Sequence, residues 1–140
     1  MGVAIPRRRF LADVHGRYQR PVFFCCDIAG ATDGAMPLNV PLAKRLLAVS
    51  SRMRSVRLAG CLDDVLSGLP DGVVICDFDV LFSPAYDIDV VSLLVNAYRR
   101  RHFDAAWPGT FDGHRLIYAE EGYPDYRTFD IHRYDITCVY

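Results

Sequence analysis

The fold of this chain is decided by one stretch, Val73-Val74-Ile75-Cys76-Asp77-Phe78-Asp79-Val80-Leu81-Phe82. Its first residues form a short apolar run, which is typical of a strand buried on both faces of a parallel sheet. Two carboxylates, Asp77 and Asp79, follow one residue apart before the chain turns at Ser83-Pro84. Ligands of α/β proteins gather at the carboxyl ends of parallel strands, and Mg²⁺ prefers carboxylate oxygens. The stretch therefore predicts a strand whose end carries two candidate metal ligands, Asp77 and Asp79.

Length and composition predict one folded domain that spans residues 1–140. The chain is 51% hydrophobic and 24% charged, which is ordinary for a folded soluble protein. Its net charge of −1 predicts no general affinity for nucleic acid or for acidic membranes. Arginine runs at residues 7–9 and 99–101 are the two concentrated basic segments. They indicate either a solvated surface or a docking patch for nucleic acid or an acidic partner.

Cysteine usage and hydropathy predict a cytoplasmic protein. The five cysteines are odd in number and include no C-x-x-C pair, so we expect neither a disulfide framework nor structural zinc. The arginines near the N-terminus are not followed by the apolar region of a signal peptide. No apolar run reaches the length that spans a bilayer, so we expect no membrane association.

The hydrophobic pattern predicts a three-layer α/β domain with a mainly parallel sheet. A polar, basic connection is expected at residues 50–57, and a polar and aromatic turn at 120–127. The predicted helices cover residues 8–19, about ten residues from Asn39, 58–69 and 88–101. The predicted strands cover residues 22–26, 73–78, 104–107, 115–119 and, as a last edge strand, 133–139.

The small-residue loop after the strand at 22–26 lies where a P-loop NTPase holds its phosphates. Such a loop offers backbone N–H groups to the phosphates and places a lysine on them. Gly30, Thr32 and Gly34 are the candidate nucleotide-binding residues here, with ATP and Mg²⁺ as the cofactors. However, no Gly-Lys-Ser/Thr follows, and Asp33 would repel phosphate. The single lysine, Lys44, lies inside the next predicted helix. We therefore predict a degenerate phosphate loop, with a plain surface turn as the alternative.

Two other interpretations of Asp77 and Asp79 stay open at this point. The pattern Asp-x-Asp after an apolar strand resembles the nucleophile motif of haloacid-dehalogenase-like phosphatases. That chemistry also needs a later lysine, and none follows Lys44. The other interpretation is an acidic strand end in which Asp79 caps the next turn.

Three segments together resemble a known family. They are residues 37–47 (PLNVPLAKRLL), residues 73–84 around the acid-bearing strand, and a C-terminal set formed by AAWPG at 105–109, LIYAE at 116–120 and GYPDYR at 122–127. In these segments the chain resembles the small P-loop-like protein of type 3 BREX bacteriophage-defence systems. The similarity covers residues 37–127.

The resemblance implies a P-loop-type α/β core and a place in a multi-protein system that restricts phage. Combined with the missing phosphate lysine, it predicts a subunit that is not catalytic by itself and acts through contacts with other phage-defence proteins. An alternative is an active Mg²⁺-dependent ATPase completed by oligomerisation, in which Arg99, Arg100 or Arg101 of a neighbouring copy serves as an arginine finger. A second alternative is a DNA-binding accessory subunit that uses the two arginine runs.

Overall fold

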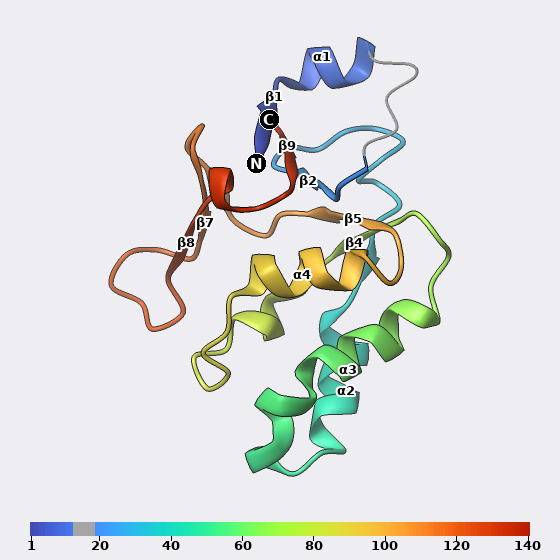
Figure 1. Ribbon diagram of the computed structural model, residues 1–140, viewed down its shortest axis with the longest axis vertical. Helices are drawn as coiled ribbons and strands as arrows, with labels where there is room; N and C mark the ends of the chain where they lie inside the picture. Colours follow the sequence, from blue (N-terminus) through green and yellow to red (C-terminus); the bar gives the residue numbers. More distant parts are fainter. Residues whose placement is uncertain (13–18) are drawn as a thin grey trace.

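A six-stranded parallel sheet forms the centre of the molecule in the computed structural model, which describes residues 1–12 and 19–140 (Figure 1). The strand order is β1-β9-β2-β5-β4-β3, and each neighbouring pair runs parallel. The prediction of an α/β fold with a mainly parallel sheet is thereby confirmed. The strands are β1 (Val3–Ile5), β2 (Val22–Phe24), β3 (Met36–Pro37), β4 (Val73–Cys76), β5 (Phe103–Ala106) and β9 (Thr137–Val139).

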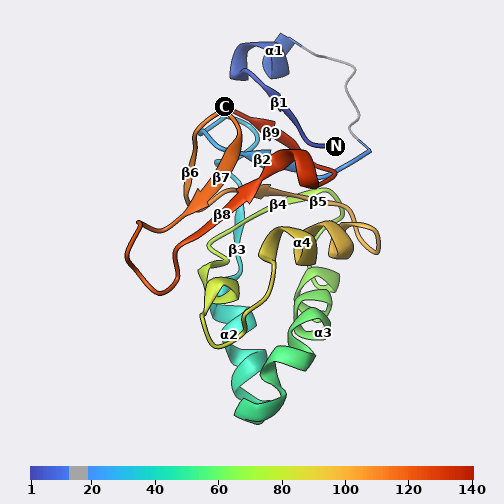
Figure 2. The same ribbon diagram turned by 60° about the vertical axis from the view of Figure 1, so that its left-hand side comes forward.

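Helices flank the sheet because its strands are apolar on both faces. Phe23 and Cys138 point into the larger core cluster with the helices α2, α3 and α4. Phe24 points to the opposite face, where the ring of Phe10 from α1 meets it edge-on at 5.4 Å. Figures 1 and 2 show α2 and α3 as a helical hairpin that extends away from the sheet. The helices are α1 (Arg7–Ala12), α2 (Asn39–Leu47), α3 (Arg54–Ser67) and α4 (Val90–Tyr98), and the 3-10 turns are η1 (Ser51–Met53), η2 (Asp79–Phe82) and η3 (Ile131–Arg133).

The central strands are also joined by a side chain. The N–H of Val22, at the start of β2, donates to Asp104 Oδ1 on β5 at 2.8 Å. Burial raises the pKa of Asp104, and the hydrogen bond from Val22 and the proximity of His102 oppose that shift. Asp104 therefore holds two neighbouring strands together while its charge is poorly solvated.

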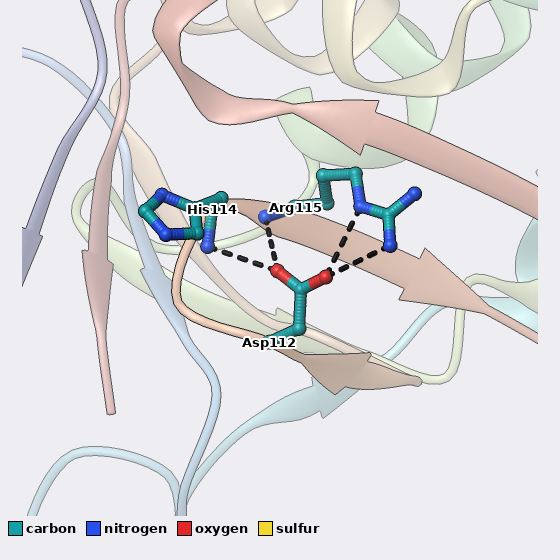
Figure 3. Close-up of polar contacts among 3 residues, drawn as sticks. All are labelled: Asp112, His114 and Arg115. Atoms are coloured by element: carbon teal, nitrogen blue, oxygen red, sulfur yellow. Dashed lines mark hydrogen bonds and ion pairs between the residues drawn. The ribbon is translucent and has the colours of Figure 1, made fainter.

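A small antiparallel sheet forms from β6 (Thr110–Phe111), β7 (Arg115–Tyr118) and β8 (Arg127–Asp130). Its first turn is closed by Asp112 (Figure 3). Asp112 accepts from the backbone N–H groups of His114 and Arg115 at 2.9 and 2.7 Å and pairs with the Arg115 guanidinium at 3.0 Å. These hydrogen bonds, chiefly the two from the backbone, lower the pKa of Asp112 to about 2.

The two sheets meet closely at Trp107 and Gly109. Trp107 Nε1 donates to the carbonyl oxygen of Ile117 on β7 at 3.0 Å. A Cβ atom at Gly109 would lie 1.9 Å from that same oxygen, so only glycine fits at this position. The Pro108-Gly109 step after β5 thus allows the small sheet to pack against the main one.

Several sequence predictions were wrong in position or missed an element. Residues 50–57 are not a simple connection, because they contain η1 and the first turn of α3. The last strand is β9, and it lies between β1 and β2 instead of at an edge. The predicted helix at 8–19 is observed only over Arg7–Ala12, and residues 13–18 lie outside the described residues. Strands β1, β3, β6 and β8 were missed, since two to four residues carry too little periodicity. Among the helices of the described chain, none has the length and apolar character needed to cross a membrane.

Candidate functional site

The carboxyl ends of the six parallel strands meet at one edge of the sheet. Asp77 follows β4 directly, and Asn39 begins α2 one residue after β3. An open pocket of about 560 Å³ lies where the first residue of α1 meets the loop that leaves β2. It is lined by Arg7, Asp27, Ile28, Ala29, Thr32 and Asp33. This is the edge at which ligands of α/β proteins bind.

The predicted phosphate loop is closed by hydrogen bonds within itself. The Thr32 hydroxyl accepts from the Ile28 N–H at 2.9 Å and donates to the Ile28 carbonyl at 3.2 Å. The backbone N–H groups of Ala31 and Thr32 also donate to the Ile28 carbonyl, at 3.0 and 2.9 Å. The N–H of Gly30 donates to Asp33 Oδ1 at 3.0 Å. The groups that would bind phosphate at Gly30 and Thr32 therefore already have partners.

The segment between β2 and β3 also lacks the helix that a phosphate loop needs. Residues 25–35 form bends and turns, and Gly30 has a positive φ of 80°. A phosphate-binding loop normally opens a helix whose N-terminal N–H groups and dipole attract the anion. Gly34 is exposed on this loop. The assignment of Gly30, Thr32 and Gly34 as nucleotide ligands stays a prediction.

Asp77 leaves its carboxylate exposed at the carboxyl edge while its backbone forms a tight junction. Its φ of 47° is in the left-handed region, which aspartate adopts more readily than most residues. This turn lets the N–H of Leu38 donate to the carbonyls of Cys76 and Asp77, at 2.9 and 3.2 Å. Asp77 thus connects the end of β4 to the beginning of α2.

Both carboxylate oxygens of Asp79 are engaged by side chains from distant parts of the chain. Asp79 Oδ1 accepts from Asn39 Nδ2 at 3.3 Å, and Asp79 Oδ2 accepts from the Tyr118 hydroxyl at 3.0 Å. Asn39 Oδ1 in turn accepts from the N–H of Val80 at 2.9 Å. Burial, followed by the hydrogen bond to Asp79, raises the pKa of Tyr118 above its ordinary value. The expectation that Asp79 itself caps the next turn was wrong, because Asn39 supplies that hydrogen bond.

The Asp79 network joins three elements of the fold. Asn39 belongs to α2, Asp79 to η2 and Tyr118 to β7 of the small sheet. The Tyr118 ring stacks on Phe82 with centroids 3.7 Å apart, and this stacking fixes the position of the Tyr118 hydroxyl. Neither Asn39 nor Tyr118 was identified from the sequence, since they lie 40 and 39 residues away from Asp79.

The structure thus separates the two predicted metal ligands by environment. Asp77 is exposed, whereas Asp79 is half-buried and holds two partners. Within the part of the chain that the structure describes, no three histidine, cysteine, aspartate or glutamate side chains converge to hold a metal ion. The Mg²⁺ assignment of Asp77 and Asp79 stays a prediction.

The second arginine run is largely occupied by contacts within the fold. Arg100 pairs with Asp63 of α3 at 2.9 Å. Arg101 donates to the carbonyl of Leu69, just beyond the end of α3. Arg99 is exposed and lines a second pocket of about 260 Å³ between α4 and the segment after η3. Two of the three arginines therefore fix α4 and its C-terminal end to α3.

Comparisons with known proteins add no name to this site. No protein-family model, curated protein sequence or solved structure matches the chain significantly.

Proposed function

We propose that this protein is a P-loop-like subunit of a bacterial phage-defence complex of the BREX type that acts through protein contacts and does not hydrolyse nucleotide by itself. The observation that carries the proposal is the loop at residues 27–35. In the proposed P-loop arrangement it takes the phosphate position, yet the N–H groups of Gly30, Ala31 and Thr32 and the threonine hydroxyl are bonded within the loop. The assignment to a BREX-type phage-defence system rests on the resemblance over residues 37–127.

The strand order supports the P-loop lineage. With β1 left out, the strands of the main sheet are β2, β3, β4, β5 and β9 in chain order, and we number them 1 to 5. Their order across the sheet is then 5-1-4-3-2. This is the order of the P-loop ATPases in which one strand separates the phosphate-loop strand from the acid-bearing strand. In this arrangement the loop after β2 takes the phosphate position, and Asp77 after β4 takes the position of the Mg²⁺-site acid.

The chemistry available at that edge supports loss of nucleotide binding. Asp27 and Asp33 line the pocket beside a single cation, Arg7. Lys44 lies in the last turn of α2, about 7 Å along the helix axis from Asn39 at the carboxyl edge. A triphosphate with its several negative charges would meet two carboxylates and no lysine.

Calorimetric titration of the protein with Mg²⁺-ATP tests this proposal. We expect no measurable heat of binding at millimolar nucleotide, because the phosphate-binding groups have internal partners. Thr32→Val serves as a matched control, since it removes the hydroxyl that closes the loop at a similar side-chain volume. Micromolar binding by the wild-type protein would refute the degenerate site, and its loss in Thr32→Val would assign the bound nucleotide to this loop.

The second candidate is an ATPase completed by another copy, and Arg99 favours it. Arg99 is exposed and has no ion pair among the described residues, whereas the equally exposed Arg100 is paired with Asp63, so Arg99 is the arginine available to act on a neighbouring copy. ATP hydrolysis per mole of protein that rises with protein concentration, and that is lost in both Asp77→Asn and Arg99→Ala, would establish this function. Arg100→Ala would instead weaken the fold through its pair with Asp63.

A further inference from the structure

The α2–α3 hairpin has a basic surface that neither arginine run revealed. From Gly34 to Leu62 the chain contains no acidic residue. Five basic residues lie within those 29 positions: Lys44, Arg45, Arg52, Arg54 and Arg57. We call residues 39–60, which form α2, η1 and the first half of α3, the basic hairpin. Figures 1 and 2 show that it projects from the body of the molecule.

Large apolar side chains are exposed on the same hairpin. Leu47 at the end of α2 is 70% exposed, and Val56 in the first turn of α3 is 73% exposed. Between the two helices lies a pocket of about 220 Å³, lined by Arg45, Val49, Arg57, Gly60, Cys61 and Asp64. Asp64 pairs with Arg45 at 3.6 Å, so Arg57 is the cation of this pocket for which the structure shows no ion pair within the described residues. Exposed apolar groups beside cations are typical of a protein-binding surface.

The basic hairpin is held in a fixed shape. Arg54 Nε donates to the carbonyls of Leu46 and Val49, at 2.8 and 3.2 Å, and so closes the C-terminal end of α2. The N–H of Met53 donates to the Ser50 carbonyl at 2.9 Å within η1. A surface that is already ordered loses less conformational entropy when a partner binds.

A second projection of the same chain has the complementary chemistry. The loop between β7 and β8 carries Glu120, Glu121 and Asp125, with Tyr123 61% exposed between them. We call residues 119–126 the acidic loop. Figures 1 and 2 show that it extends from the small sheet in a direction different from that of the basic hairpin.

The acidic loop is also preformed. The N–H of Tyr123 donates to the Glu120 carbonyl at 3.2 Å, and that of Tyr126 to the Tyr123 carbonyl at 3.1 Å. The Arg127 guanidinium donates to the carbonyls of Pro124 and Tyr126, at 3.3 and 2.9 Å. The single arginine next to this loop is thus engaged with loop carbonyls, and the three carboxylates remain its dominant charge.

From this complementarity we infer that the acidic loop of one copy docks on the basic hairpin of a second copy. Tyr123 enters the pocket between α2 and α3, where the arginines can lie against its ring. A carboxylate of Glu120 or Glu121 pairs with Arg57, which lines that pocket. The two surfaces differ, so the contact is head-to-tail and joins copies into a ring or an open chain.

A protein occupant fits the hairpin better than a nucleic acid does. Phosphates would engage its cations but would leave Leu47 and Val56 in water, whereas a loop with an exposed aromatic ring covers apolar surface as well. The inference goes beyond the proposed function, because self-association does not depend on what the complex restricts.

Sedimentation velocity from low micromolar to near-millimolar protein tests the contact. We expect the average mass of the wild type to rise with concentration and to fall when salt is added, because surface ion pairs are screened. Arg57→Glu and the double variant Glu120→Gln/Glu121→Gln should each weaken self-association by about tenfold or more. Arg133→Glu, an equivalent charge reversal at an exposed site outside both surfaces, should leave it unchanged. Circular dichroism confirms that each variant is folded.

Mixing the two weakened variants identifies the geometry. Arg57→Glu retains an intact acidic loop, and the glutamine variant retains an intact basic hairpin, so a mixture should form one-to-one dimers that grow no further. A wild type that stays monomeric at every concentration would overturn the inference. So would a mixture that stays monomeric, or an association that Arg57→Glu leaves unchanged. Binding of duplex DNA by a monomeric wild type, lost in Arg57→Glu, would overturn it as well and assign the hairpin to nucleic acid.

Discussion

Replacing Tyr118 by phenylalanine tests whether Asp79 belongs to the fold or to a metal site. The substitution removes one hydroxyl, which donates to Asp79 Oδ2 at 3.0 Å, and leaves the ring stacked on Phe82. A hydrogen bond to a charged group contributes about 1.5–3 kcal/mol, and its loss leaves the carboxylate short of a partner. Because Asp79 is only half-buried and water can partly replace the hydroxyl, we expect Tyr118→Phe to lower the free energy of unfolding by about 1.5–2 kcal/mol.

Urea denaturation followed by circular dichroism measures this change. Tyr140→Phe is the matched control, since it removes a hydroxyl from a ring that is 50% exposed, and it should change stability by less than about 0.5 kcal/mol. Asp79→Asn completes a double-mutant cycle with Tyr118→Phe. We expect a coupling energy of about 1–2 kcal/mol between the two positions, because each substitution removes part of the same contact.

Added Mg²⁺ separates the structural role from the metal-binding role. If Asp79 serves the fold, millimolar Mg²⁺ should leave the melting temperature of the wild type unchanged. A ligand that binds the folded state raises apparent stability by mass action. Stabilisation by Mg²⁺ that disappears in Asp79→Asn, together with additive effects in the cycle, would refute the structural role.

Three further predictions concern the fold and its charges. Gly109→Ala should lower the free energy of unfolding by about 3 kcal/mol or more, because its Cβ would lie 1.9 Å from a backbone oxygen. Gly60→Ala is the control in the same denaturant titration: its Cβ would lie in open space inside α3, so it should raise the free energy of unfolding by about 0.5–1 kcal/mol. Asp104→Asn should be more stable than the wild type at neutral pH, because the raised pKa of Asp104 means that the fold disfavours its ionised form. The gain in stability should shrink as pH falls and the wild-type carboxyl becomes protonated, and a gain that does not depend on pH would contradict this. The Asp112 carboxyl should titrate near pH 2 when followed by NMR. Its contribution to stability is therefore present above the ordinary carboxyl pKa near 4 and is lost as pH falls toward 2. A titration midpoint of Asp112 above about 3.5 would contradict the hydrogen bonds of the β6–β7 turn.

The sequence was most informative where apolar patterns were long or unusual. The acid-bearing strand at 73–78 and the run at 22–26 were found within a few residues, because strands inside a parallel sheet require continuous apolar residues. The helix from Asn39 was found equally closely, from the apolar face that buries Leu42 and Leu46. The absence of a helix after β2 was also predictable, since too few residues separate Cys26 from Leu38. The strand order was not, because it depends on pairs as short as the one between β3 and β4, which has two residues in register.

The chemistry of the candidate site was predictable only at the level of single residues. The spacing of Asp77 and Asp79 suggested two equivalent ligands, yet one is exposed and the other is bonded to Asn39 and Tyr118. Their difference comes from partners about 40 residues away on either side, which no local pattern encodes. Loop closure by Thr32 and Asp33 has a local signal, since both residue types bond readily to nearby backbone groups.

Charge was the feature that composition described least well. A net charge of −1 predicted a surface without strong preference, and the two arginine runs drew attention as the exceptions. In the fold, Arg100 and Arg101 are bound to α3 and its end. A larger excess of positive charge lies in residues 34–62, which contain five basic side chains and no acidic one. That segment carries +5, so the other residues together carry −6.

The molecule is nearly neutral in total but carries separate basic and acidic surfaces, which favours contact between the unlike surfaces of separate copies over binding to a uniformly charged polymer. The parallel sheet and the small sheet packed against it hold the basic hairpin and the acidic loop in different directions. Under the proposed function these surfaces position partners, so the ionic-strength dependence of assembly is the quantity to measure before any search for turnover.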